Sequence, residues 1–170
     1  MTKGTSIASL SNQPPLKTVL IGLGAGPEKI LLPGLTSLKE INLTAACDLN
    51  SEARNRAAAQ WPIPRLYDDA GEMLTAEKPE LVVVGTPPKT HHAFSLLALE
   101  HRAHLFCEKP FMTSLAEADE VLAKASQLHR LVSVNSQYYQ MPIYRRLQTA
   151  LDQNEVGRLY QIDAWQQMYL

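Results

Sequence analysis

The chain has 170 residues, a formal net charge of −1 at neutral pH, 45% hydrophobic residues and 19% charged residues. This profile is typical of a single globular domain of about 150 residues, which can bury a core without metals or disulfides. The near-neutral charge excludes nucleic acid as the main partner, because binding a phosphate backbone needs a basic surface. No apolar segment approaches the ~20 residues of a membrane span, so the sequence predicts no membrane association.

The N-terminus and the cysteines bear on location. Residues 1–15 are small and polar, contain one lysine and lack the apolar core of a signal peptide, so we expect a short disordered lead-in. Cys47 and Cys107 each end an apolar run and are not spaced as a zinc clip or a redox pair. They are therefore predicted to be small core residues of a protein in the reducing cytoplasm.

From residue 18 onward, short apolar segments alternate with helical ones. Apolar runs without polar alternation suit strands that are buried on both faces. The Pro33-Gly34 pair should bend or split the first helix, whereas Asp69 and Ser114 each begin a capping box. In chain order, the expected elements are strand 18–22, helix 27–39, strand 43–48, helix 51–60, strand 65–67, a short helix after Asp69, strand 81–84, helix 91–100, strand 104–107, helix 114–129 and strand 131–134.

This alternation predicts an α/β fold in which right-handed crossovers build a doubly wound parallel sheet. Six such strands that begin with a glycine-rich turn indicate a Rossmann dinucleotide-binding fold, in which ligands bind at the carboxyl ends of the strands. The residues that follow the strands are therefore the candidate site residues, and they are 22–27, 48, 86–92, 108–110 and 135–139.

A glycine-rich loop follows the first expected strand. Gly22 allows a tight turn, and Gly24, followed by Ala25 and Gly26, lets the backbone approach a pyrophosphate at a helix N-terminus. The third small residue of the usual pattern falls at position 27, where Pro27 stands, and Gly26 is expected to replace part of the lost close packing. A plain structural turn is the alternative interpretation.

Asp48 ends the second strand, about twenty residues beyond the glycine turn. A carboxylate at this position can accept hydrogen bonds from both ribose hydroxyls of NAD, and it would repel the 2′-phosphate of NADP. The sequence therefore favours NAD. Arg54 and Arg56 lie in the next helix and could reach a phosphate, which leaves NADP open, and Asp48 could also serve as a helix cap.

The loop after the fourth strand contains Thr86 and Pro87 and leads to His91 and His92 at the start of a helix. These histidines are either site residues or helix-capping and surface residues. Since no acidic or cysteine partner stands at ligand spacing, we expect no metal site.

Glu108, Lys109 and Pro110 follow the fifth strand. A lysine in the low-dielectric environment of a bound cofactor can exchange a proton, and Glu108 could orient it or bind a carboxamide. The alternative is a Glu108–Lys109 ion pair on the surface.

Taken in order, these motifs resemble the N-terminal domain of the glucose–fructose oxidoreductase, inositol dehydrogenase and rhizopine-catabolism family (Gfo/Idh/MocA). The resemblance implies NAD(P) binding and oxidation of a hydroxyl group on a sugar, cyclitol or related polyol, or the reverse reduction. The motifs are the glycine turn, Leu32-Pro33-Gly34-Leu35, Cys47-Asp48, Val84-Gly85-Thr86-Pro87-Pro88 with His91, and Glu108-Lys109-Pro110, the most specific of them.

The resemblance also implies a role for each matching position. Lys109 would be the catalytic or proton-shuttling lysine beside the nicotinamide, and Glu108 would help to place the cofactor. The dinucleotide would be held by Gly22, Gly24 and Asp48, and its nicotinamide side would be lined by Thr86, Pro87 and His91.

Three departures from the family pattern stand out. Pro27 replaces a small residue, and 135–142 lacks the arginine of many members, with Tyr138 or Tyr139 near its place. The third is the second α/β domain of the family, which is largely missing. We expect a domain over 16–150 and the start of a truncated C-terminal domain over 151–170, with 157–165 resembling its first strand.

The expectation for function follows from these points. We expect a chain that binds NAD weakly and turns over poorly by itself, with 157–170 available to an oligomer or to a partner that supplies the second domain. The alternatives are a non-catalytic dinucleotide-binding module or partner subunit, and a structural remnant that neither binds nor catalyses.

Overall fold

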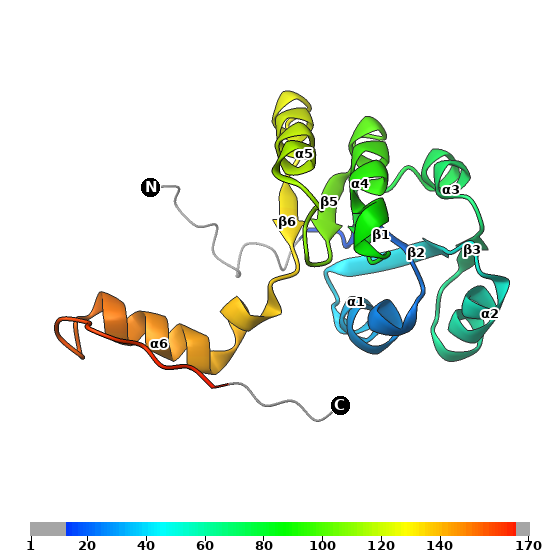
Figure 1. The fold of residues 1–170 in the computed structure, drawn as a ribbon. Helices are drawn as coiled ribbons and strands as arrows, with labels where there is room; N and C mark the ends of the chain where they lie inside the picture. The colour runs from blue at the N-terminus through cyan, green and yellow to red at the C-terminus, as the bar shows by residue number, and fades with distance from the viewer. Residues whose placement is uncertain (1–12, 166–170) are drawn as a thin grey trace. The chain divides into compact units, whose positions relative to one another are not determined.

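A computed structural model describes residues 13–165, so the expected lead-in over 1–15 lies almost entirely outside the described residues (Figure 1). The chain divides into two compact units, with the boundary between Asn135 and Ser136. The first unit contains the sheet and the helices that cover it. Among its described residues, the second unit contains a short 3₁₀ helix and an α-helix.

The sheet of the first unit has six strands in the order β3-β2-β1-β4-β5-β6, and every neighbouring pair is parallel. This order confirms the predicted doubly wound fold, and each expected strand of this unit is present within a few residues of its expected bounds. The strands are β1 (Leu16–Ile21), β2 (Ile41–Cys47), β3 (Arg65–Tyr67), β4 (Leu81–Val84), β5 (His104–Cys107) and β6 (Val132–Val134).

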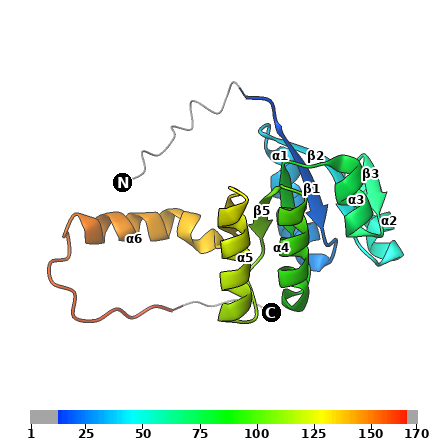
Figure 2. The same ribbon diagram turned by 90° about the horizontal axis from the view of Figure 1, so that it is seen from above.

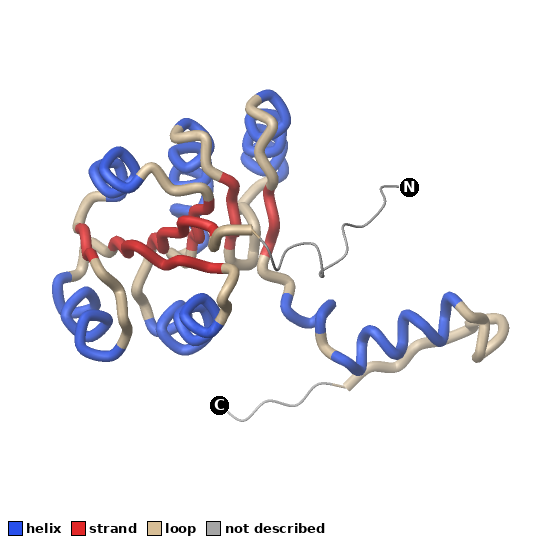
Figure 3. Tube along the Cα trace, turned by 180° about the vertical axis from the view of Figure 1, so that it is seen from behind, coloured by secondary structure: helices blue, strands red, loops and turns tan. Residues whose placement is uncertain are grey.

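Helices cover both faces of this sheet. One face carries η2 (Pro27–Leu31), α1 (Leu32–Ser37) and α2 (Ser51–Gln60), and the other carries α3 (Ala70–Glu77), α4 (His91–Glu100) and α5 (Leu115–Gln127) (Figure 1). Figure 2 shows α4 and α5 side by side. In Figure 3 the strands, in red, lie between the two layers of helices, in blue. The short η3 (Pro88–Thr90) leads into α4.

The two layers explain why the strands show no polar alternation. Val19 and Ile21 of β1 pack in one core cluster with residues of α3, α4 and α5, whereas Leu20 packs in a second cluster with residues of η2, α1 and α2. Successive strand residues point to opposite faces, so a strand covered on both sides must be apolar at every position.

Side-chain caps fix the starts of three helices. Asp69 Oδ1 accepts a hydrogen bond from Glu72 N at 2.7 Å, and Ser114 Oγ accepts one from Glu117 N at 3.2 Å, as the capping-box motifs predict. The proposed capping role of Asp48 is wrong, because Asn50 Oδ1 accepts from the N–H groups of residues 52 and 53 at the start of α2.

The first helical segment is not split at Pro33. It runs continuously over 25–37, and the irregularity precedes the proline as a π-type turn in which Leu32 N donates to Pro27 O. The wider turn takes the place of the expected interruption, since Pro33 has no N–H group to continue the regular pattern.

Pro27 is accommodated by Gly85, and the expectation that Gly26 compensates for it is wrong. A Cβ atom on Gly26 would meet nothing within 4 Å. A Cβ atom on Gly85 would lie 2.7 Å from Pro27 Cγ and 2.9 Å from Leu31 Cδ1. Gly22, at φ +101°, lies against the same segment, because its Cβ would be 2.9 Å from the carbonyl carbon and oxygen of Gly85.

The second unit contains η4 (Gln137–Gln140) and α6 (Pro142–Asp152). The apolar side chains of α6, among them Ile143, Tyr144 and Leu147, are exposed. The segment 157–165, which resembles the first strand of the family's second domain, pairs with no strand of the described chain, and its residues are exposed. An extended segment without a partner gains no ladder hydrogen bonds.

We predict that Gly85→Ala lowers the free energy of unfolding by about 1–3 kcal/mol, because the added methyl group collides with Pro27. Adding Pro27→Ala should recover part of this loss, since it removes the Pro27 Cγ atom and leaves the close contact with Leu31 Cδ1 in place. Urea unfolding of the two single variants and the double variant measures the coupling.

Gly34→Ala is the matched control, because a Cβ atom there would meet nothing within 4 Å. Additive effects of the Gly85 and Pro27 substitutions would contradict the steric coupling.

The two cysteines are buried free thiols with raised pKa values. Burial is the main cause that raises the pKa of Cys47 to about 12, with the nearby carboxylates of Asp69, Asp48 and Asp68 adding to it. Burial also raises the pKa of Cys107 to about 12. Since the thiolate is the reactive form, we predict that iodoacetamide at about pH 8 labels neither cysteine in the folded protein.

The control is the same labelling in guanidinium chloride, where both thiols should react at the rate of an unhindered cysteine. Labelling of either thiol in the folded protein at that rate would contradict the prediction.

Candidate functional site

The residue that directly follows each of five strands lies on the same edge of the sheet. Each of them extends the ladder by one step, because its N–H donates to the last residue of the neighbouring strand. The pairs are Gly22 to Cys47 at 2.8 Å, Asp48 to Tyr67 at 3.1 Å, Gly85 to Ile21 at 2.8 Å, Glu108 to Val84 at 2.9 Å and Asn135 to Cys107 at 2.8 Å. The predicted strand-end residues are therefore brought together along the carboxyl edge.

The glycine loop is open to solvent. Gly24, Ala25 and Gly26 are exposed, and a Cβ atom on Gly24 or Gly26 would meet nothing within 4 Å. Helical structure begins at Ala25, and Glu28 N donates to Gly24 O at 3.0 Å. The N–H groups of a first helical turn lack acceptors within the helix, so this loop fits the phosphate groups of a dinucleotide.

The Asp48 carboxylate is half-buried and is oriented by two backbone groups. Its Oδ2 accepts from Leu23 N in the glycine loop at 2.7 Å, and its Oδ1 accepts from Asn50 N at 2.9 Å. Each carboxylate oxygen has capacity for a second hydrogen bond. Asp48 is thus a fixed acceptor pair beside the glycine loop, which suits a vicinal diol such as that of a ribose.

The two arginines that left NADP open are both engaged. Arg54 Nη1 donates to Asp48 O at 2.7 Å and to Leu49 O at 3.1 Å. Arg56 Nε lies 3.5 Å from Glu28 Oε1. A 2′-phosphate would therefore meet the charge of Asp48 and two guanidinium groups that already have partners.

His91 joins two loops of this edge. It is 0% exposed, its Nε2 lies 2.8 Å from Thr86 O, and its Nδ1 lies 2.9 Å from Pro110 O and 3.2 Å from Phe111 O. With no exposed surface, the ring holds the loops after β4 and β5 together instead of lining a cofactor site. His92 is different, since its Nε2 lies 2.9 Å from Glu120 Oε2 on α5.

The loop after β4 presents Thr86 and Pro87 at the edge. Thr86 is half-buried and Pro87 is exposed. The hydroxyl oxygens of Thr86 and Thr90 are 2.9 Å apart, and Thr90 Oγ1 lies 2.8 Å from Pro87 O. These contacts stabilise the turn, and the Pro87 side chain remains exposed to solvent.

The ion pair between Glu108 and Lys109, the alternative interpretation of this motif, is not formed in the described chain. Glu108 Oε2 accepts from the backbone N–H of Lys109 at 3.0 Å, and its Oε1 accepts from Asn135 Nδ2 at 2.5 Å. Within residues 13–165 the exposed Lys109 ammonium has no carboxylate partner. The peptide bond between Lys109 and Pro110 is cis.

Asn135 is the site residue that the sequence did not single out. It belongs to the expected segment 135–139 after the last strand, but its contact with Glu108 joins residues 27 positions apart. The available signal was its place directly after β6, since the corresponding residues after β2 and β5 are also polar.

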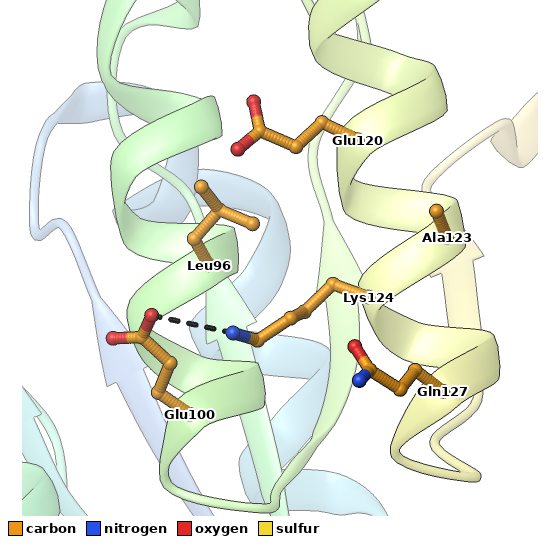
Figure 4. Close-up of a pocket in the computed structure, with 6 residues that line it drawn as sticks. All are labelled: Leu96, Glu100, Glu120, Ala123, Lys124 and Gln127. Atoms are coloured by element: carbon orange, nitrogen blue, oxygen red, sulfur yellow. Dashed lines mark ion pairs between the residues drawn. The ribbon is translucent and has the colours of Figure 1, made fainter.

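Three further kinds of feature bear on function: metal sites, membrane-spanning helices and depressions away from the carboxyl edge of the sheet. Residues 13–165 contain no group of three or more histidine, cysteine, aspartate or glutamate side chains arranged to hold a metal ion. None of the helices described is long and apolar enough to cross a membrane. A depression of about 300 Å³ lies between α4 and α5, bridged by a Glu100–Lys124 ion pair of 3.6 Å (Figure 4), and none of its lining residues is a predicted site residue.

Known proteins share this arrangement over most of the chain. The D-glucoside 3-dehydrogenase of Escherichia coli strain K12 is 26% identical over 146 residues, which are 86% of this chain and 42% of that protein. The myo-inositol 2-dehydrogenase structure from Lactobacillus plantarum superposes with a TM-score of 0.79 at 23% identity, covering 85% of this chain and 43% of that one.

A third protein is the scyllo-inositol dehydrogenase of Lactobacillus casei, whose structure holds NAD(H) and scyllo-inositol. It superposes with a TM-score of 0.78 at 21% identity over 84% of this chain and 42% of that one. The chain thus spans less than half the length of each of these proteins. Residues 16–136 match the oxidoreductase family with an NAD-binding Rossmann fold. The chain therefore belongs to the Gfo/Idh/MocA oxidoreductase family, and this segment is its NAD-binding Rossmann domain.

Proposed function

We propose that the carboxyl edge of this sheet binds NAD for the oxidation of a hydroxyl group on a sugar, a cyclitol or a related polyol, or for the reverse reduction. One observation carries the proposal. The Lys109 ammonium is exposed and has no carboxylate partner in the described chain, on the same edge as an open glycine loop and the oriented Asp48 carboxylate. Two of the similar proteins are named as dehydrogenases of a glucoside and of an inositol, which supports this substrate class.

In this proposal, different residues of the carboxyl edge bind different parts of the cofactor. The backbone of Gly22, Gly24, Ala25 and Gly26 receives the pyrophosphate, and Asp48 accepts the hydroxyls of the adenosine ribose. The nicotinamide half lies toward β4 and β5. It is lined by Thr86 and Pro87 from the loop after β4 and by Glu108 and Lys109 from the loop after β5. His91 contributes by holding the loops that carry these residues.

The chemistry needs a hydride acceptor and a group that manages the hydroxyl proton. Bound NAD⁺ supplies the acceptor for the hydride that leaves the alcohol carbon. The neutral amine form of Lys109 would accept the hydroxyl proton during oxidation and become the ammonium, and the ammonium would return that proton during reduction. No carboxylate of the described chain pairs with this nitrogen, which leaves it available to the substrate. Glu108, which binds its own neighbour's N–H, keeps the lysine backbone in place.

Two further points belong to the same proposal. The exposed apolar side chains within 157–165, such as Tyr160 and Ile162, would pack against a further domain or a second copy of the chain. The free thiols Cys47 and Cys107 support a location in the reducing cytoplasm.

We predict that the chain binds NAD⁺ more tightly than NADP⁺, and that Asp48→Asn narrows this preference by about tenfold. The substitution removes the charge that repels a 2′-phosphate and one of the acceptors for the ribose hydroxyls. Isothermal titration calorimetry with both dinucleotides measures the ratio.

The control is Asp119→Asn, which removes an exposed carboxylate on α5, away from the strand ends. Tighter binding of NADP⁺ by the unmodified chain would refute the assignment of NAD.

Substitution of Lys109 separates binding from catalysis. We predict that Lys109→Ala, in a protein that joins this domain to the second domain of the family, lowers the rate of NADH formation from myo-inositol or a glucoside by about 100-fold or more, as expected for the loss of a general acid–base. The dissociation constant for NAD⁺ should change by no more than about twofold, because the ammonium acts on the substrate.

Lys39→Ala, an exposed lysine between α1 and β2, is the matched lysine control. A chain that binds NAD⁺ and forms a stable complex with another protein through 157–170 would support the non-catalytic module instead. Unchanged turnover after Lys109→Ala would exclude the catalytic role of this lysine.

A further inference from the structure

We propose that Asn135 is a positioning residue that holds the Glu108 carboxylate away from the Lys109 side chain and thereby orders the nicotinamide half of the site. This inference rests on the proposed function, since it assigns the β5 side of the edge to the nicotinamide. Asn135 itself touches neither cofactor nor substrate in this proposal and acts through Glu108.

Asn135 is fixed at two points. Its backbone N–H donates to Cys107 O at 2.8 Å, which continues the β5–β6 ladder by one residue. Its side-chain Nδ2 donates to Glu108 Oε1 at 2.5 Å. A carboxylate can only accept, so the amide nitrogen must face Glu108. Both side chains are half-buried, where a charge-assisted hydrogen bond is stronger than at an exposed surface.

The second oxygen of Glu108 completes a continuous connection. Oε2 accepts from the backbone N–H of Lys109 at 3.0 Å, so one carboxylate links the end of β6 to the backbone of the lysine. If the Glu108 side chain moved toward the Lys109 ammonium, it would lose the hydrogen bonds to both Asn135 Nδ2 and Lys109 N. The amide of Asn135 therefore fixes the orientation in which Glu108 supports the Lys109 backbone.

The alternative arrangement is the one suggested by the sequence alone. Neighbouring glutamate and lysine side chains readily form an ion pair, and the long lysine side chain has the reach for it. In the structure the carboxylate faces Asn135, and no ion pair joins Glu108 to Lys109 in the described chain. Removing the amide would release the carboxylate to pair with the ammonium that the proposed chemistry needs unpaired.

The test compares two ligands that differ only in the nicotinamide ring. NAD⁺ and ADP-ribose share the adenosine, the pyrophosphate and the second ribose, so a change confined to the nicotinamide pocket affects NAD⁺ alone. We expect Asn135→Ala to weaken NAD⁺ binding by about tenfold and ADP-ribose binding by less than about twofold. Ser133→Ala, in the strand β6 that Asn135 follows, should change neither dissociation constant.

A second variant tests the hydrogen bond itself. Asn135→Asp places two carboxylates in contact, which repel when both are ionised and share a proton when one is protonated. The preference for NAD⁺ over ADP-ribose should therefore be lost at about pH 8 and recover toward the unmodified value at about pH 5, whereas the preference of the unmodified chain stays nearly constant. A purely structural role would show no such recovery.

The outcomes separate this inference from the proposed function. If the unmodified chain binds neither ligand, the proposed function is refuted, and this inference with it. If the unmodified chain binds both, equal weakening of NAD⁺ and ADP-ribose by Asn135→Ala, or no weakening, refutes the positioning role alone. Circular dichroism establishes that each variant is folded, and Asn135→Asp carries the test if Asn135→Ala does not fold.

Discussion

The site depends on the contact between the chain segments that leave β1 and β4. These two strands are neighbours at the centre of the sheet, and the helices that follow them cover opposite faces. The backbone at Gly22 lies so close to Gly85 that Gly22 has no room for a Cβ atom, and the side chains of Pro27 and Leu31 leave no room for one on Gly85. The crevice that a doubly wound sheet offers to a ligand opens from this point.

The two carboxylates of this edge are held by backbone N–H groups, whereas its lysine is not held by a charged partner in the described chain. The Asp48 carboxylate accepts one backbone N–H group from the glycine loop and one from its own loop, and the Glu108 carboxylate accepts one from its own loop, so their positions are set before any ligand binds. The Lys109 ammonium has no such partner in the described chain. Fixed acceptors suit recognition of an unreactive part of a cofactor, whereas a mobile amine suits the transfer of a proton to different positions.

Local patterns in the sequence predicted the fold well, because each strand, turn and cap is encoded by neighbouring residues. The order of apolar segments predicted all six strands, and the spacing of Ser114 and Glu117 predicted the start of α5. The misses are contacts between distant residues. Gly85 makes room for Pro27, and Asn135 binds Glu108, yet neither residue has a local pattern that names its partner.

The segment 157–165 shows that a local sequence pattern alone is not sufficient to form a strand. Its alternating apolar residues satisfy the local pattern of a strand, but Tyr160 and Trp165 are 85% and 93% exposed and no strand is formed. A helix satisfies its backbone within itself, whereas a strand needs the N–H and C=O groups of another segment. An alternating pattern therefore predicts a face that can be buried, and a partner edge must be present before that face becomes part of a sheet.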